Sequence, residues 1–192
     1  MLEKLKIECG APTVAKITKM FTDVDLSLEL QREFKAKFPV QGLNFQVQAI
    51  SQGCWHVAAS PPVKIPRAMM ECTDQFKKFY SEQYSNRRID WLFNLGRAEV
   101  TPVFAAKPYQ ITVSVFQAAV LDQFNSGDSF SIEELQNATN IELAQLKPAL
   151  LAMCNPKVKL LNKQIKKPTL DNPKEQISIN LDFKNKDIKI SV

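Results

Sequence analysis

The spacing of apolar residues changes several times along this 192-residue chain. In some stretches they recur every three or four residues, as on one face of a helix. In others they alternate with polar residues, as in a half-buried strand. Helical spacing covers residues 1–38, 66–84 and 114–153, and two-residue spacing dominates elsewhere. The pattern predicts an α+β chain in three parts: the C-terminal part of a helical bundle (1–38), a small α/β domain of one sheet and one helix (39–112), and a winged-helix domain (113–192).

The first 38 residues are predicted to be helical. Pro12 suits the first turn of a helix. Ser27 is placed to cap a second helix that runs towards Phe38, with Leu30 and Phe34 four apart on its buried face. The chain opens in charged, helix-forming sequence, so we expect it to continue a longer helical region.

Residues 44–50 carry the clearest strand pattern. Phe45, Val47 and Ala49 alternate with polar side chains, which predicts a strand with one buried face. The elements expected after it are a proline-rich loop over 51–66, a helix over 66–84, two extended runs over 89–95 and 98–104 joined at Gly96, and a strand over 109–113.

The last 80 residues predict three helices followed by a β-hairpin, which is the order of a winged helix. The first helix spans about 114–124. Ser131, with Glu134 three residues later, forms a capping box for the second. The third follows Asn140, points Leu143, Leu146 and Leu150 inward, and contains Pro148, which removes one backbone hydrogen bond and kinks or delays the helix. The hairpin strands are expected near 177–183 and 188–192, around a turn at 184–187.

The residue types that most enzymes and metal sites need are sparse. His56 is the one histidine, and the four cysteines (Cys9, Cys54, Cys72, Cys154) form no CxxC pair, so we expect free thiols, no metal and no cofactor. Cys54 and His56 lack a third, orienting group, and there is no glycine-rich phosphate loop. The sequence therefore favours a non-catalytic protein.

Targeting signals are also lacking. The first residues have no apolar core of a signal peptide, and no run approaches the roughly 18 apolar residues of a spanning helix. We expect a soluble, intracellular protein of the cytoplasm and nucleus, without a membrane partner.

The positive charge lies in the C-terminal segment. Residues 157–192 carry nine lysines and four acids, which accounts for the whole net charge of +5. One hypothesis is a winged-helix nucleic-acid-binding protein that uses these lysines. In the predicted third helix, however, only Gln145 is a side chain suited to reading bases. A winged helix that contacts proteins is the better interpretation, and nucleic acid is the less favoured partner.

Several spaced motifs, in order along essentially the whole chain, match a pattern shared by one protein family. The run 76–80 (FKKFY), followed by 85–91 (SNRRIDW), resembles the cullin pattern FxxFY … SGRxLxW. Residues 9–10 (CG), 19–23 (KMFTD) and 26–27 (LS) are similar to the stretch that ends the cullin helical bundle, and 113–121 (VSVFQAAVL) and 124–125 (FN) are similar to the start of the first cullin winged helix. The departures mark a divergent member: His56 follows Trp55 where the family has proline, Asn86 replaces a glycine, and Pro148 is unusual in the third helix.

The resemblance implies a scaffold in a cullin-RING ubiquitin ligase. The α/β sheet edge would pair with an N-terminal strand of a small RING-finger protein, which in turn recruits a ubiquitin-conjugating enzyme; cullin regulators are further expected partners. Adaptor-binding repeats would precede Met1, and the lysine that accepts a ubiquitin-like modifier would follow Val192. The alternative is that the candidate residues are ordinary core. The candidates for RING-protein binding are Phe45, Val47, Ala49, Ile50, Trp55, Trp91 and Phe93.

Overall fold

The computed structural model describes residues 7, 8, 10–39, 43–164, 170 and 172–192. The prediction of an α+β chain is confirmed, with five α-helices and two small sheets in these residues. The chain forms two compact units, Met1–Ala58 with Glu71–Ile89 and Ala59–Met70 with Asp90–Val192. The domain boundaries expected after residues 38 and 112 stay a prediction.

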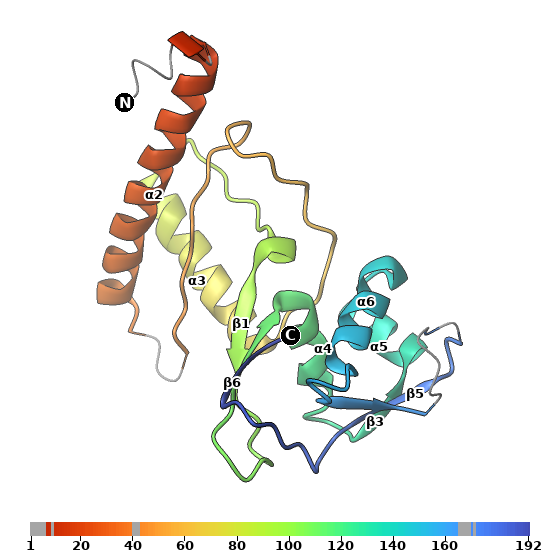
Figure 1. The fold of residues 1–192 in the computed structure, drawn as a ribbon. Helices are drawn as coiled ribbons and strands as arrows, with labels where there is room; N and C mark the ends of the chain where they lie inside the picture. The colour runs from red at the N-terminus through yellow and green to blue at the C-terminus, as the bar shows by residue number, and fades with distance from the viewer. Residues whose placement is uncertain (1–6, 9, 40–42, 165–169, 171) are drawn as a thin grey trace. The chain divides into compact units, whose positions relative to one another are not determined.

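The first unit contains helix α2, which runs without a break from Ala11 to Lys37 (Figure 1). The expected cap at Ser27 is therefore wrong. Ser27 lies inside the helix, where its hydroxyl donates to the carbonyl of Asp23 at 2.6 Å. A serine that bonds back to the preceding turn needs no helix end.

An aromatic core joins α2 to the part of helix α3 (Arg67–Gln83) that belongs to this unit, from Glu71 onward. The ring of Phe34 is 1% exposed and lies 5.2 Å from that of Phe76 and 5.5 Å from that of Phe79, centroid to centroid. Phe45 adds its ring at 5.9 Å from Phe34. Tilted and edge-on pairs of this kind stabilise a core beyond their buried area. The buried face predicted for Leu30 and Phe34 lies in this core.

The strand predicted over residues 44–50 does not form. The segment is extended, but none of the strands in the described part of the chain pairs with it. Side chains of α2 take its hydrogen bonds instead. The alternation of apolar and polar residues correctly predicted extended backbone. It does not reveal which groups form hydrogen bonds with that backbone.

The second unit holds the sheet β1–β2–β6, built from Arg97–Val100, Gln110–Ser114 and Lys189–Ser191. β1 pairs antiparallel with β2, and β6 runs parallel to β2. The extended run expected over 89–95 is wrong at its end, because Phe93–Leu95 forms a turn of 3-10 helix. Gly96 follows it, where a Cβ atom would lie 2.6 Å from Cγ2 of Val115.

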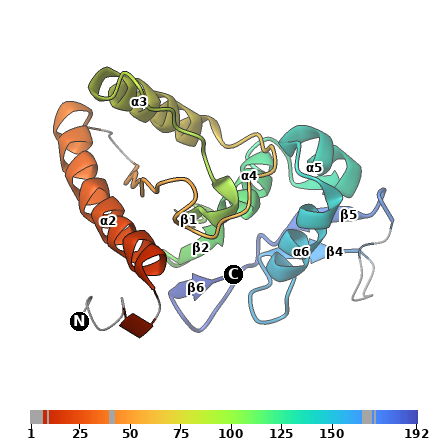
Figure 2. The ribbon, with the colours of Figure 1, turned by 90° about the horizontal axis from the view of Figure 1, so that it is seen from above.

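Helices α4 (Val115–Gln123), α5 (Ile132–Thr139) and α6 (Leu143–Met153) pack with a second sheet, β3–β5–β4 (Figure 2). The sheet consists of Ser129–Ser131, Gln176–Ile179 and Leu161–Lys163, with antiparallel pairs. The capping box of Ser131 and Glu134 is confirmed. Leu146 and Leu150 are fully buried, whereas Leu143 is 37% exposed, contrary to expectation. Pro148 lies inside α6 without ending it.

The hairpin predicted around residues 184–187 is wrong. β5 pairs with β3 and β4, and β6 joins the other sheet. The reason lies at Phe183, which is 2% exposed and packs its ring 5.0 Å from that of Tyr109. The Tyr109 hydroxyl also accepts a hydrogen bond from the backbone N–H of Asn185. These contacts hold the chain against the first sheet of this unit instead of folding it back along β5.

Candidate functional site

Helix α2 aligns three polar side chains along one face, Asp23, Ser27 and Gln31. They are four residues apart, which corresponds to about 6 Å of helix per step. An extended chain repeats its orientation every two residues, or about 6.6 Å. Because the two repeats nearly match, one helix face can meet every second peptide of an extended segment. Figure 1 shows residues 44–51 running beside α2.

Gln31 bonds this segment through both ends of its amide. Its Nε2 donates to the carbonyl of Phe45 at 2.7 Å, and its Oε1 accepts the backbone N–H of Val47 at 2.8 Å. A peptide group on a neighbouring strand offers the same pair of functions, one donor and one acceptor. The Gln31 side chain thus replaces one peptide of a missing strand.

Ser27 and Asp23 continue the pairing along the segment. The Ser27 hydroxyl oxygen accepts the N–H of Ala49 at 2.8 Å. Oδ2 of Asp23 accepts the N–H of Ser51 at 2.7 Å, and Oδ1 accepts the Ser51 hydroxyl at 2.7 Å. Oδ2 also accepts the indole N–H of Trp55 at 2.9 Å. The carboxylate therefore closes the far end of the segment and the start of the following loop.

The Asp23 carboxyl is 2% exposed and holds its charge. Burial raises the pKa of this carboxyl. Hydrogen bonds from the Ser51 backbone, the Trp55 indole and the Ser51 hydroxyl, together with the charge of Lys19, lower this pKa by more than burial raises it. The net effect is a pKa below the usual 3.8. Lys19 Nζ lies 3.4 Å from Oδ1. A buried carboxylate with several donors remains ionised and fixes their positions.

The opposite edge of the segment has free peptide groups. In an extended chain the N–H and C=O of one residue point to the same side, and the next residue's point to the other. Phe45, Val47 and Ala49 face α2, so Gln46, Gln48 and Ile50 face away. Within the described part of the chain, the backbone groups of those three residues have no hydrogen-bond partner. They form an unpaired edge, here defined as the backbone of Gln46, Gln48 and Ile50.

The structure assigns different places to the predicted site residues. Phe45 is part of the aromatic core, and the half-buried Val47 and Ala49 direct their peptides to α2. Ile50 belongs to the unpaired edge, and Trp55 is anchored to Asp23. Trp91 and Phe93 belong to the second unit, where their rings stack at 6.2 Å, and they do not form the expected strand. Their role in binding stays a prediction.

Sequence reasoning missed Asp23, Ser27 and Gln31. The available signal was their four-residue spacing on the same side of the helix as Leu30 and Phe34, where an apolar stripe would be expected. Polar residues on the buried side of a helix require partners. The partners here are peptide groups, which no side-chain pattern displays.

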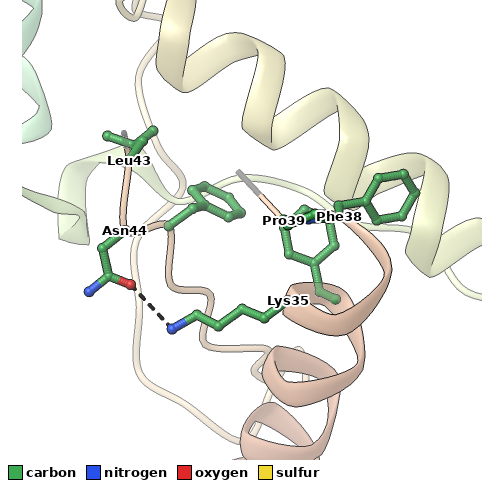
Figure 3. Close-up of a pocket in the computed structure, with 7 residues that line it drawn as sticks. Lys35, Phe38, Pro39, Leu43 and Asn44 are labelled. Atoms are coloured by element: carbon green, nitrogen blue, oxygen red, sulfur yellow. Dashed lines mark hydrogen bonds between the residues drawn. The ribbon is translucent and has the colours of Figure 1, made fainter. Parts of the chain in front are cut away.

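One hollow lies at the start of the segment and another lies beside Trp55. One, of about 420 Å³, is lined by residues at the end of α2 and by Leu43, Asn44 and Phe45; Lys35 Nζ donates to Asn44 Oδ1 across it at 3.2 Å (Figure 3). The other, of about 240 Å³, has an apolar lining of Ile17, Met20, Phe21, Val24 and Trp55.

Other classes of site receive no support from the side chains that the structure describes. No three His, Cys, Asp or Glu side chains among them converge as metal ligands do. Cys54, Cys72 and Cys154 are free thiols, and burial raises the pKa of Cys154 to about 11. The expectation for Cys9 lies outside the described residues. No helix in the described ranges is long and apolar enough to cross a membrane.

Comparison with known proteins identifies the family. The model of the cullin alpha+beta domain matches residues 49–183. The chain is 34% identical to cullin-4A of Mus musculus over its full length, 31% identical to cullin-1 of Dictyostelium discoideum over its full length, and 31% identical to cullin-3 of Dictyostelium discoideum over 88% of it. It spans about a quarter of the length of these relatives: 26%, 26% and 22%, respectively. With a family model over most of its length and relatives along all of it, this chain belongs to the cullin family.

Proposed function

We propose that this chain is a non-catalytic scaffold segment of a cullin-RING ubiquitin ligase and that it docks a small RING-finger protein. The observation that supports it most directly is the unpaired edge in a member of the cullin family. The docked RING-finger protein would hold a ubiquitin-conjugating enzyme in position for ubiquitin transfer. The chain's own contribution is to bind and orient, not to react.

Strand addition is the docking mode that the edge favours. A partner strand beside Gln46, Gln48 and Ile50 would pair with N–H and C=O groups that point to one side. Each such hydrogen bond stabilises the complex by only about 1 kcal/mol net. Specificity therefore requires side-chain contacts.

The three helices and the β3–β5–β4 sheet support a winged-helix assignment for the C-terminal part. We propose that it contacts proteins or acts as a spacer. The nucleic-acid alternative, which relies on the C-terminal lysines, is not favoured by the similarity to cullins. It predicts DNA affinity that falls steeply with salt and depends on those lysines.

Cullin regulators are further proposed partners, and the cytoplasm and nucleus are the proposed location. The free thiols of Cys54, Cys72 and Cys154 suit a reducing compartment. Imaging of the full-length protein in cells tests the proposed location.

The docking proposal is tested by residue-resolved amide exchange with a recombinant small RING-finger protein, with and without its N-terminal extended segment. Binding is expected to slow exchange at Gln46, Gln48 and Ile50, and to leave Val47 and Ala49 nearly unchanged, because α2 already bonds their N–H groups. Loss of the partner's segment should abolish the effect.

A proline substitution sharpens this test. Gln48→Pro removes one donor from the unpaired edge, while the side chain it replaces is exposed. We expect affinity to fall about tenfold or more, as loss of a hydrogen bond and a steric clash with the added strand imply. Ala58→Pro, in an exposed part of the following loop, is the matched control. Unchanged affinity of Gln48→Pro, or no binding by a folded chain, would contradict docking at this edge.

A further inference from the structure

We propose that Asp23, Ser27 and Gln31 are positioning residues that stand in for a neighbouring β-strand and hold residues 45–51 ready for strand addition. The inference rests on the proposed function, since it concerns how the same edge is prepared before a partner binds. These side chains touch no partner themselves. They act through the backbone that they hold.

Asp23, Ser27 and Gln31 bond to the segment in a regular pattern. The three side chains make four hydrogen bonds to backbone groups of alternate residues in one segment, from Phe45 to Ser51. Ser27 contributes one of these as the acceptor of the Ala49 N–H, while its own proton is donated to the carbonyl of Asp23 within the helix. A helix that only packed against this segment would need apolar side chains here. Polar side chains at three positions, each four residues from the next, form hydrogen bonds with the peptide groups instead.

Both ends of the segment are anchored. At one end the Phe45 ring packs against Phe34 and Phe76 at 5.9 and 6.3 Å. At the other end Ser51 and Trp55 both bond to the buried Asp23 carboxylate. The unpaired edge lies between these anchors. The segment is held extended there, with the peptide groups of its other side already bonded to α2.

A segment that is already held extended binds a partner strand more tightly. Fixing a backbone segment costs conformational entropy, and a segment already fixed in the free protein does not incur this cost on binding. The apparent dissociation constant equals the intrinsic one divided by the fraction of molecules that are in the competent conformation, so affinity falls with that fraction. Weakening the pairing with α2 therefore lowers affinity without removing any contact with the partner.

The first experiment uses the chain alone. Gln31→Met keeps the length of the side chain and removes both amide bonds. Amide exchange at Val47 is expected to accelerate about tenfold or more, because its acceptor is lost. Glu29→Met places the same new side chain at an exposed position of the same helix and should leave exchange unchanged. Equal exchange at Val47 in the native chain and in Gln31→Met would overturn the proposal.

The second experiment measures binding of the recombinant RING-finger protein. Gln31→Met is expected to weaken binding roughly 3- to 30-fold, with a melting temperature of the α4–α6 region unchanged. Faster exchange with unaltered affinity would overturn the positioning role. If the native chain binds no RING-finger protein, the docking proposal fails, and the exchange result alone decides whether α2 holds the segment.

A second pair of variants tests Asp23. Asp23→Ala removes every acceptor of the buried carboxylate and risks unfolding the chain. Asp23→Asn keeps one oxygen that can accept from Ser51 or Trp55, and it should therefore retain part of the exchange protection that Asp23→Ala loses. The Trp55 indole N–H resonance reports this directly. An unshifted resonance in both variants would overturn the assignment of Asp23.

Discussion

The indole N–H of Trp55 donates a 2.9 Å hydrogen bond to Oδ2 of Asp23, which ties the loop after the extended segment to the middle of helix α2. The same oxygen accepts the N–H of Ser51. One carboxylate thereby sets both the end of the segment and the start of the loop. The segment that carries the proposed docking edge is therefore held by a helix and not by a neighbouring strand.

Replacing the indole tests the stabilising role of this bond. Trp55→Phe keeps an aromatic ring and removes the donor to Asp23. Because hydrogen bonds to charged groups are the stronger ones, we expect a loss of about 2 kcal/mol in the free energy of unfolding. Urea unfolding followed by circular dichroism measures it. His56→Ala, at the exposed next residue, should change little, and equal losses in the two variants would contradict the prediction.

Acid stability should depend on Asp23. Its pKa in the folded chain lies below 3.8, so its stabilising contribution is present above the unfolded-state pKa and is lost as pH falls through the lower folded value. Asp23→Asn removes this dependence and should make the free energy of unfolding less steep in pH below about 4. Urea titrations across this pH range measure the slope. Asp25→Asn removes an exposed carboxylate of the same helix, and a matching change there would contradict the assignment.

The start of helix α5 depends on the capping box of Ser131 and Glu134. The Ser131 hydroxyl accepts the N–H of Glu134 at 3.2 Å, and Oε2 of Glu134 accepts the N–H of Ser131 at 2.7 Å. Ser131→Ala should cost about 1 kcal/mol, the usual cost of losing such a cap. Thermal and urea unfolding measure it. Asn137→Ala, an exposed change inside the same helix, serves as control and should be neutral or stabilising.

Gly96 is required by close packing and not by a positive φ. A Cβ atom there would lie 2.6 Å from Cγ2 of Val115. Gly96→Ala should therefore destabilise the second unit by about 1–3 kcal/mol through overpacking. The double variant with Val115→Ala removes the clashing methyl group, so the two losses should be less than additive. Additive losses in urea unfolding would show that the clash is not the cause.

Local signals predicted much of the helical structure. The helix over 66–84 matches α3, and the capping box at Ser131 marks the start of α5. Caps and periodic apolar faces act within a few residues, so they can be read from sequence. Ser27 was misplaced as a cap because a serine that bonds back to the preceding turn has the same sequence appearance as one that begins a helix.

The predicted hairpin around residues 184–187 and the predicted strand over residues 44–50 were wrong for the same physical reason. In both cases the pairing partner lies far away in the sequence. Residues 177–183 and 188–192 have strand patterns, but burial of Phe183 against Tyr109 sends β6 to a sheet that also contains β2. Residues 44–50 are extended as the alternation indicates, yet their partner is a helix. Side-chain pattern specifies which face of an extended segment is buried, but it carries no information on what accepts its peptide hydrogen bonds.

By itself the sequence determined the cullin family motifs, the helical stretches and the extended character of residues 44–50, because each depends on residue type at short spacing. Only the tertiary structure decided that Asp23, Ser27 and Gln31 pair with that segment and that Gln46, Gln48 and Ile50 form the unpaired edge. The physical reason is that backbone hydrogen bonds are the same for every residue, so their partners follow from the geometry of the folded chain.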